Sequence, residues 1–278
     1  MKKLQKLLLF LKLKFSTSSH FPFKKTLLDE VVAVNRRSTV NITNWISDDV
    51  LNNSYFRYGV PDYIRPLLDK PIDNNYTYTD FIVYYSKQLN KPVSYLELGV
   101  SVGKNFYQLM NVWEKASIVG FDIENINPTI EQNLELESKQ KFKLGIKSIR
   151  TEDGYFNHYT HNSNKVSYLA GDIYDETCWQ KLQGKRFNVI FSDALHDPKA
   201  LLFEYEMIKK YNLLDDDFLF FWDDLNHGLE KSFYSVSKDL KNKYELTKEN
   251  IFLVKVNGWL GQHEISHDVG LVTNIDLN

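Results

Sequence analysis

A series of short apolar runs, separated by stretches of helix length, constrains the fold of this chain more than any other feature. Each run is hydrophobic on both faces, which is typical of strands buried in a parallel sheet. Alternation of such strands with helices predicts a doubly wound α/β fold. The runs lie at residues 93–98, 117–123, 165–173, 187–194 and 217–224.

The first run ends in a glycine turn, within the stretch SYLELGVSVGKNF. Gly99 and Gly103 bound this turn, and apolar residues then recur at helical spacing. Turns of this kind present backbone N–H groups to a ligand. The spacing is one residue short of a phosphate-binding loop, and Asn105 stands where a magnesium-binding hydroxyl is needed. Glu97 precedes the turn, and its carboxylate repels phosphate and attracts a cationic or amine-bearing ligand.

This arrangement resembles motif I, E-x-G-x-x-x-G, of the class I S-adenosylmethionine-dependent methyltransferases. The resemblance implies a Rossmann-like, seven-stranded sheet that is mostly parallel, with an antiparallel last strand. It also implies S-adenosyl-L-methionine as cofactor, which carries an ammonium and a sulfonium group and no phosphate. The residues implied at the methionine end of the cofactor are Glu97, Gly99, Val100 and Gly103. A dinucleotide-dependent dehydrogenase is disfavoured, because its G-x-G-x-x-G is missing.

Acidic residues follow the predicted strands at their carboxyl ends, where open parallel sheets bind ligands. Asp122 closes the second strand, and a carboxylate there can accept both hydroxyls of a ribose. Asp172 and Ile173 resemble the methyltransferase position that contacts the adenine edge, and Asp193 lies at the next strand end. Any one of these aspartates would also fit as the cap of the following helix.

A narrower resemblance concerns SDALHD and WDDLN, which contain Asp193, His196, Asp223 and Asp224. They are similar to the D-x-x-H and the strand-five acidic pair of metal-assisted O-methyltransferases that act on sugars, natural products and catechols. The resemblance implies Mg²⁺ held by the three aspartates, which would lower the pKa of a substrate hydroxyl. Two other interpretations remain open. His196 could act directly as the general base, without a metal, or Asp193 and Asp197 could only cap a helix. The family's Pro-Gly-Gly turn before strand five is replaced by LLDDDF.

The stretch GQHEISHDVGLV contains H-E-x-x-H, formed by His263, Glu264 and His267. A zinc protease needs both histidines on one helical face and a third ligand, and Thr273 occupies the place of the third histidine. The flanks are rich in β-branched residues, which favours a hairpin that closes the sheet. We therefore disfavour the protease.

The net charge and the cysteine content say less about function, and concern only the kind of partner and the cellular compartment. The chain has 278 residues and a net charge of −2, so no strong signal for nucleic acid is present and a small-molecule acceptor is expected. Cys178 is the single cysteine, which suits a reducing, cytoplasmic compartment. A homo-oligomer is compatible with the sequence.

The expected organisation has three parts. Residues 1–20 form a basic amphipathic segment. Three roles remain open for it: peripheral membrane contact through residues 1–15, an organelle address, and docking on the rest of the protein. Residues 21–90 form a helical cap, in which Tyr76 and Tyr78 would lie near the cofactor. Residues 91–278 form the methyltransferase domain, with an insertion at 138–164 for which a lid, a subunit contact and a solvated excursion remain open.

The resemblance thus implies methyl transfer from S-adenosylmethionine, with O-methylation of a small hydroxylated molecule such as a sugar or natural product. The residues expected to orient or deprotonate the acceptor are Asp193 and His196. The alternative is a non-catalytic nucleotide-type binding domain or a scaffold partner in a complex.

Overall fold

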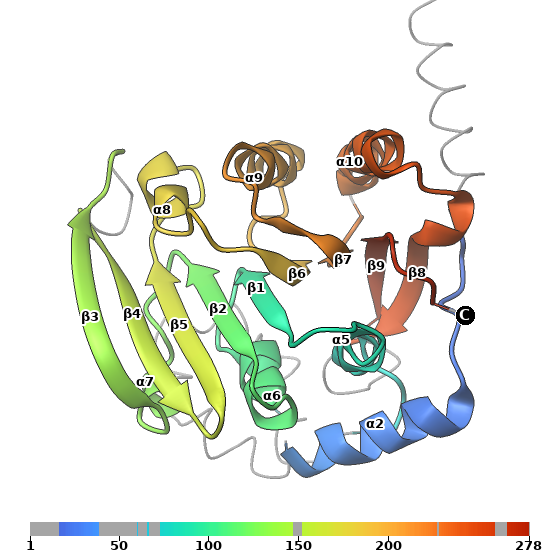
Figure 1. Cartoon of the computed structure of the whole chain (residues 1–278), viewed down its shortest axis with the longest axis horizontal. Helices are drawn as coiled ribbons and strands as arrows, with labels where there is room; N and C mark the ends of the chain where they lie inside the picture. Colours follow the sequence, from blue (N-terminus) through green and yellow to red (C-terminus); the bar gives the residue numbers. More distant parts are fainter. Residues whose placement is uncertain are drawn as a thin grey trace, which may run out of the picture.

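The computed structural model describes residues 17–38, 60, 66, 73–146, 152–226, 228–258 and 266–277. These residues form a nine-stranded sheet in the order β3-β4-β5-β2-β1-β6-β7-β9-β8, with helices on both faces (Figure 1). The predicted doubly wound α/β fold is confirmed, because neighbouring central strands are joined by crossovers and not by hairpins.

The central strands coincide with the predicted apolar runs and pair in parallel. Burial on both faces explains their composition, and every residue of β6 is buried. Because these strands run the same way, their carboxyl ends meet at one edge of the sheet. The strands are β1 (Ser94–Leu98), β2 (Ser117–Asp122), β5 (Asn164–Ala170), β6 (Phe187–Ser192) and β7 (Leu214–Trp222).

Two apolar cores lie on opposite faces of the sheet. The helices that cover one face are α2 (Lys25–Ser38), α5 (Tyr78–Ser86), α6 (Lys104–Val112) and the short α7 (Pro128–Glu131) (Figure 1). The helices that cover the other face are α8 (Glu176–Gln180), α9 (Pro198–Lys210) and α10 (Leu229–Tyr244), which is followed by a short 3₁₀ turn, η3 (Lys248–Asn250).

Helix α5 agrees with the helical character expected of residues 21–90. Thr77 caps it, and Asp80 completes a reciprocal capping box by bonding back to the Thr77 backbone. Every residue of α5 is buried. In the described part of the predicted cap, α5 and α2 therefore pack as a layer on the sheet, together with α6; residues 39–59, 61–65 and 67–72 of that cap lie outside the described residues.

The segment predicted as an insertion supplies two further strands of the same sheet. β3 (Glu135–Lys143) and β4 (Asp153–His161) form an antiparallel pair, and β4 continues the sheet from β5. The expectation of seven strands was wrong for a physical reason: β3 is an edge strand, exposed along nearly its whole length, and lacks an apolar run. Its lysines and an irregularity in the β3–β4 pairing are devices that keep an edge strand from adding another chain.

The chain ends in the predicted hairpin. β8 (Ile251–Asn257) and β9 (Ser266–Thr273) are antiparallel, and β9 inserts between β8 and β7. His267 thus lies on a strand, whereas His263 and Glu264 of the H-E-x-x-H motif lie outside the described residues.

Within the described ranges, no helix combines the length and the apolar character needed to cross a membrane. Most of the predicted basic N-terminal segment, residues 1–16, lies outside those ranges.

Candidate functional site

The glycine turn after β1 holds a carboxylate of the chain itself. Asp122 Oδ2 accepts hydrogen bonds from the backbone N–H groups of Val100, at 2.6 Å, and Ser101, at 2.7 Å. Its other oxygen accepts from the N–H of Glu124 at 2.8 Å. The free N–H groups expected of such a turn therefore stabilise the end of β2, and Asp122 orders the turn.

The two glycines allow neighbouring segments to approach this turn. Both have a φ of 84°, in the left-handed region. A Cβ on Gly99 would lie 2.2 Å from the backbone oxygen of Asp193, and one on Gly103 would lie 2.4 Å from Ile130 Cδ1. The ends of β1 and β6 thus come into direct contact, which brings Asp193 beside the turn.

Glu97 lies on β1, just before the turn, and is only 2% exposed. It accepts a hydrogen bond from Tyr95 Oη at 2.9 Å, and Asn105 donates to the same hydroxyl at 2.8 Å. Burial raises the pKa of Glu97 well above its ordinary range. A cationic ligand beside this carboxyl group would favour its charged form, whereas an anionic ligand would not.

Two aspartates and a histidine meet at the carboxyl end of β7. His267 Nδ1 lies 2.9 Å from Asp223 Oδ2 and 3.0 Å from Asp224 Oδ1. Consecutive residues of an extended strand point to opposite faces, but Asp224 has a φ of 47°, which turns the chain so that both carboxylates reach His267. Burial lowers the pKa of His267, but the two carboxylates outweigh it and raise the pKa to about 10.

Asp193 and His196 complete this acidic group. His196 Nε2 lies 3.2 Å from Asp193 Oδ1 and 3.6 Å from Asp224 Oδ2. The hydrogen bond that His196 donates to Asp193 is the main cause that raises the pKa of His196, whose side chain is 34% exposed. Burial, and then the charge of Asp223, raise the pKa of Asp193. The structure therefore groups the four residues predicted from SDALHD and WDDLN. The capping alternative applies to Asp197, which accepts from the Lys199 N–H as the N-cap of α9.

Two further side chains border this group. Tyr78, from the first turn of α5, is fully buried; its ring stacks on Phe191 at 5.3 Å and meets the His267 ring edge-on at 5.4 Å. Lys104 Nζ lies 5.7 Å from the centre of the Tyr78 ring. Lys104 was not predicted as a site residue, although it directly follows Gly103. His267 was considered only as a ligand of a zinc protease, in the H-E-x-x-H match, and not as a neighbour of Asp223 and Asp224.

The predicted adenine-side residues lie at the end of β5. Asp172 Oδ1 accepts from the N–H of Tyr174 at 2.9 Å. Ile173 packs in a core, and its carbonyl accepts from the indole N–H of Trp179 at 2.7 Å. The N–H of Gly171 donates to the carbonyl of Asp122, so this strand end adjoins the glycine turn through β2.

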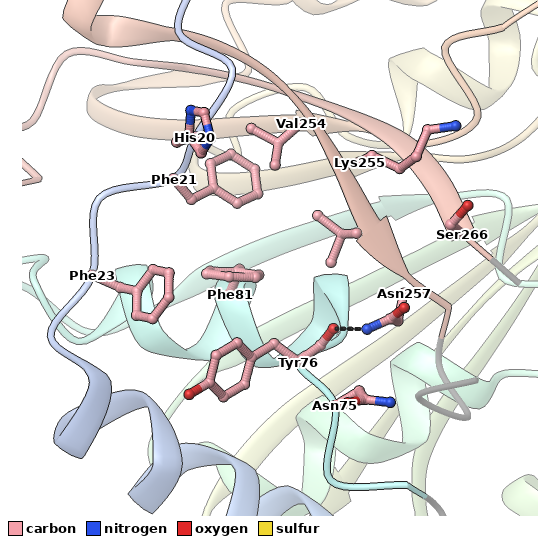
Figure 2. Close-up of a pocket in the computed structure, with 11 residues that line it drawn as sticks. His20, Phe21, Phe23, Asn75, Tyr76, Phe81, Val254, Lys255, Asn257 and Ser266 are labelled. Carbon is pink, nitrogen blue, oxygen red and sulfur yellow. Dashed lines mark hydrogen bonds between the residues drawn. The ribbon is translucent and has the colours of Figure 1, made fainter. Parts of the chain in front are cut away.

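A cavity of about 620 Å³ lies between residues 20–23, the start of α5 and β8. Figure 2 shows Phe23, Tyr76 and Phe81 on its aromatic side and Asn257 and Ser266 on its polar side. Asn257 Nδ2 donates to the Tyr76 carbonyl at 3.2 Å. The volume is in the range of small-molecule sites, but neither His267 nor the four residues predicted from SDALHD and WDDLN line it.

No protein-family model matches this sequence, and no curated protein does. Among solved structures, the chain is similar to an O-methyltransferase from Bacillus cereus in complex with SAH (S-adenosylhomocysteine), at 13% identity and a TM-score of 0.46 over 91% of this chain and 92% of that one. It is similar to the SAH-bound Podospora anserina methyltransferase PaMTH1, at 12% identity and a TM-score of 0.44 over 93% and 100%.

A third similar structure is the MycE methyltransferase from the mycinamycin biosynthetic pathway, solved with Mg and SAH. It shares 13% identity at a TM-score of 0.40, over 68% of this chain and 48% of that one. The chain thus spans about half the length of MycE. At such TM-scores these likenesses carry no argument about activity, which must come from the residues of the site.

Proposed function

We propose that this chain is an S-adenosylmethionine-dependent methyltransferase whose cofactor binds at the carboxyl ends of β1, β2 and β6. The observation that carries the proposal is Glu97, an almost fully buried acid beside the glycine turn. Asp193 acts on Glu97 by charge, and Asp223 acts on Asp193 in the same way. Such surroundings favour the ammonium and sulfonium groups of this cofactor and disfavour a polyphosphate.

The remaining parts of the cofactor have chemically suitable neighbours. Lys104 begins α6, where its charge and the helix N-terminus both favour the carboxylate of the methionine part. A ribose hydroxyl would share the Asp122 carboxylate with the N–H groups of the turn. Asp172 and Ile173 keep the adenine-side role predicted for them.

The acceptor in this proposal is a small hydroxylated molecule, such as a sugar or natural product, that is methylated on oxygen. His196 would take the proton of the acceptor, since it is partly exposed and hydrogen-bonded to Asp193. Because its pKa is raised, His196 becomes an unprotonated base at a higher pH than an ordinary histidine does. Alignment of the acceptor with the methyl group would lower the activation barrier further, since orientation can supply up to ~7–11 kcal/mol.

Calorimetry with the Glu97→Gln variant tests the cofactor assignment. We expect the wild type to bind S-adenosylhomocysteine in the micromolar range in a buffer with EDTA. Glutamine keeps an acceptor for Tyr95 and removes the charge, so the variant should bind at least about tenfold more weakly, or about 1.4 kcal/mol. Adenosine, which lacks the methionine part, is the matched control ligand and should bind both proteins equally.

An unchanged affinity of Glu97→Gln for S-adenosylhomocysteine would contradict the assignment, as would tighter binding of ATP or NAD. Production of S-adenosylhomocysteine from S-adenosylmethionine with a panel of catechols and glycosides then tests methyl transfer itself. Tight cofactor binding without transfer to any acceptor class would favour the non-catalytic alternative.

A further inference from the structure

The geometry points to a site for a divalent transition-metal cation, formed by Asp223, Asp224 and His267, which prefers such a cation to Mg²⁺. It deepens the proposed function, because the cation would lie beside the acceptor base His196. The inference concerns a ligand, His267, that comes from the last strand and lies outside the motifs that implied Mg²⁺. Cation binding is measurable without cofactor, so its test stands apart from that of the proposed function.

The distances between the donor atoms fit one cation. One ligand atom from each of the three residues lies within 4.8 Å of the other two. The nitrogen of His267 is 2.9 Å from the nearest oxygen of Asp223 and 3.0 Å from that of Asp224. Bonds of roughly 2.0–2.2 Å from a metal to nitrogen and oxygen place two ligand atoms about 3 Å apart.

The close contacts within this group are ion pairs without good hydrogen-bond geometry. His267 Nδ1 and Asp223 Oδ2 are both buried and lie 2.9 Å apart, but neither makes a well-formed hydrogen bond among the described residues. Buried polar atoms without partners are rare and point to an ion or a water molecule. A cation would displace the proton that His267 holds beside the two carboxylates, and would then take a lone pair from each of the two atoms.

Tyr78 gives a second, independent observation. Its hydroxyl is also buried without a hydrogen-bond partner in the described part of the chain, and the whole side chain is 0% exposed. The hydroxyl lies within electrostatic range of Asp223, Asp193 and Asp224, and the ring contacts His267. Water molecules bound to a cation at His267 are partners of suitable chemistry for this hydroxyl.

The donor types decide which cation fits. Mg²⁺ strongly prefers oxygen ligands in an octahedral arrangement and is seldom held by imidazole. Imidazole suits Zn²⁺, Fe²⁺ and Ni²⁺, and affinity for nitrogen-containing sites increases from Mn²⁺ through Co²⁺ to Cu²⁺. One imidazole with two carboxylates is therefore a donor set for a transition metal, and Asp193 and the two ligand aspartates add negative charge that favours any dication.

Titration of the full-length, EDTA-treated protein tests this site. Co²⁺ is the probe, because its visible absorption reports nitrogen ligation, and Mg²⁺ is titrated in parallel by calorimetry. We expect one Co²⁺ per chain, bound at least about tenfold more tightly than Mg²⁺. His267→Ala should weaken Co²⁺ about a hundredfold, alter its spectrum and remove the preference over Mg²⁺. His158→Ala is the matched control, since His158 lies on β4 and bonds to Ser167; it should bind Co²⁺ as the wild type does.

The inference would be overturned by Mg²⁺ bound as tightly as Co²⁺, or by a Co²⁺ affinity and spectrum that His267→Ala does not change. Absence of stoichiometric binding would also overturn it and would identify His267 as the cationic partner of the two aspartates. Asp224→Asn, a nearly isosteric change, provides a second variant if His267→Ala does not fold, and should also weaken Co²⁺. Binding of S-adenosylhomocysteine in EDTA would survive each of these failures.

Discussion

Replacing Asp80 with asparagine is expected to lower the free energy of unfolding by about 3–5 kcal/mol. Asp80 is 0% exposed and joins α5 to α2. It accepts hydrogen bonds from Arg36 Nη2 at 2.8 Å and Asn35 Nδ2 at 2.6 Å, and from the N–H and hydroxyl of Thr77 at 2.8 and 2.9 Å. Asparagine removes the negative charge opposite Arg36. Its side-chain NH₂ group would also lie against N–H or hydroxyl donors that the carboxylate of Asp80 now accepts from.

Urea denaturation followed by circular dichroism measures this loss. Asp29→Asn is the control, since Asp29 pairs with Lys25 on the exposed side of α2 and its own side chain is 47% exposed. That variant should unfold at nearly the wild-type urea concentration, because exposed ion pairs contribute little. An Asp80→Asn variant as stable as Asp29→Asn would show that the contact between α2 and α5 does not depend on the buried ion pair.

Much of the sheet could be predicted, because strands buried on both faces are short, continuous apolar runs, and several of them alternate with stretches of helix length. β1, β2 and β6 lie within the apolar runs of the sequence, and β5 and β7 overlap theirs but begin one and three residues earlier. β3 could not be predicted in this way, since it is exposed and its position at the sheet edge depends on pairing with β4. Local composition does not encode such pairing.

The candidate site shows the same division. Asp193, His196 and the pair at 223–224 follow parallel strands, and topology alone requires that those ends share one edge. The ligand role of His267 depends on β9 inserting beside β7, which brings Gly270 opposite Trp222. Because this strand pairing joins segments that are far apart in the chain, no local sequence motif could indicate it.

Asp122 shows how a residue beside the expected turn can have a role that the sequence did not indicate. The strand-end pattern predicted an acid beside the glycine turn, and one is present. Its oxygens accept from the turn N–H groups of Val100 and Ser101, which are the groups that we expected a ligand to meet. The sequence could not show this, because the conformation of a turn decides which acceptor its N–H groups face.

Glu204 is expected to make the protein less stable as the pH rises, and Glu204→Gln to remove that effect. Glu204 lies on α9, is 2% exposed, and its carboxyl group lies 2.6 Å from the Ser192 hydroxyl. Burial raises its pKa to about 7; the Ser192 hydrogen bond and His196 act in the opposite direction, and Asp193 adds to the increase. The ordinary value is 4.5, so the folded protein keeps a proton that the unfolded chain has lost between pH 4.5 and 7.

The sign of the effect follows from proton binding. Where the native state binds more protons than the unfolded state, the free energy of unfolding decreases with increasing pH. The free energy of unfolding therefore decreases from about pH 4.5 upward and reaches its lower level above about pH 7. A pKa raised from 4.5 to about 7 corresponds to a total loss of about 3 kcal/mol. Glutamine resembles the protonated acid in shape and charge at every pH, so the variant should gain stability over the wild type by about this amount between pH 4.5 and pH 8.5.

Urea denaturation of both proteins across this pH range, in EDTA, measures the difference, and groups that titrate equally in the two proteins cancel. Glu206→Gln is the matched control, because Glu206 lies on the same helix with a side chain that is 61% exposed; its difference from the wild type should stay nearly constant. A difference between Glu204→Gln and the wild type that does not change with pH would mean that Glu204 is charged in the native state at neutral pH. The negative charge around Asp193 would then be greater than we infer, which would strengthen the demand for a cationic ligand at the strand ends.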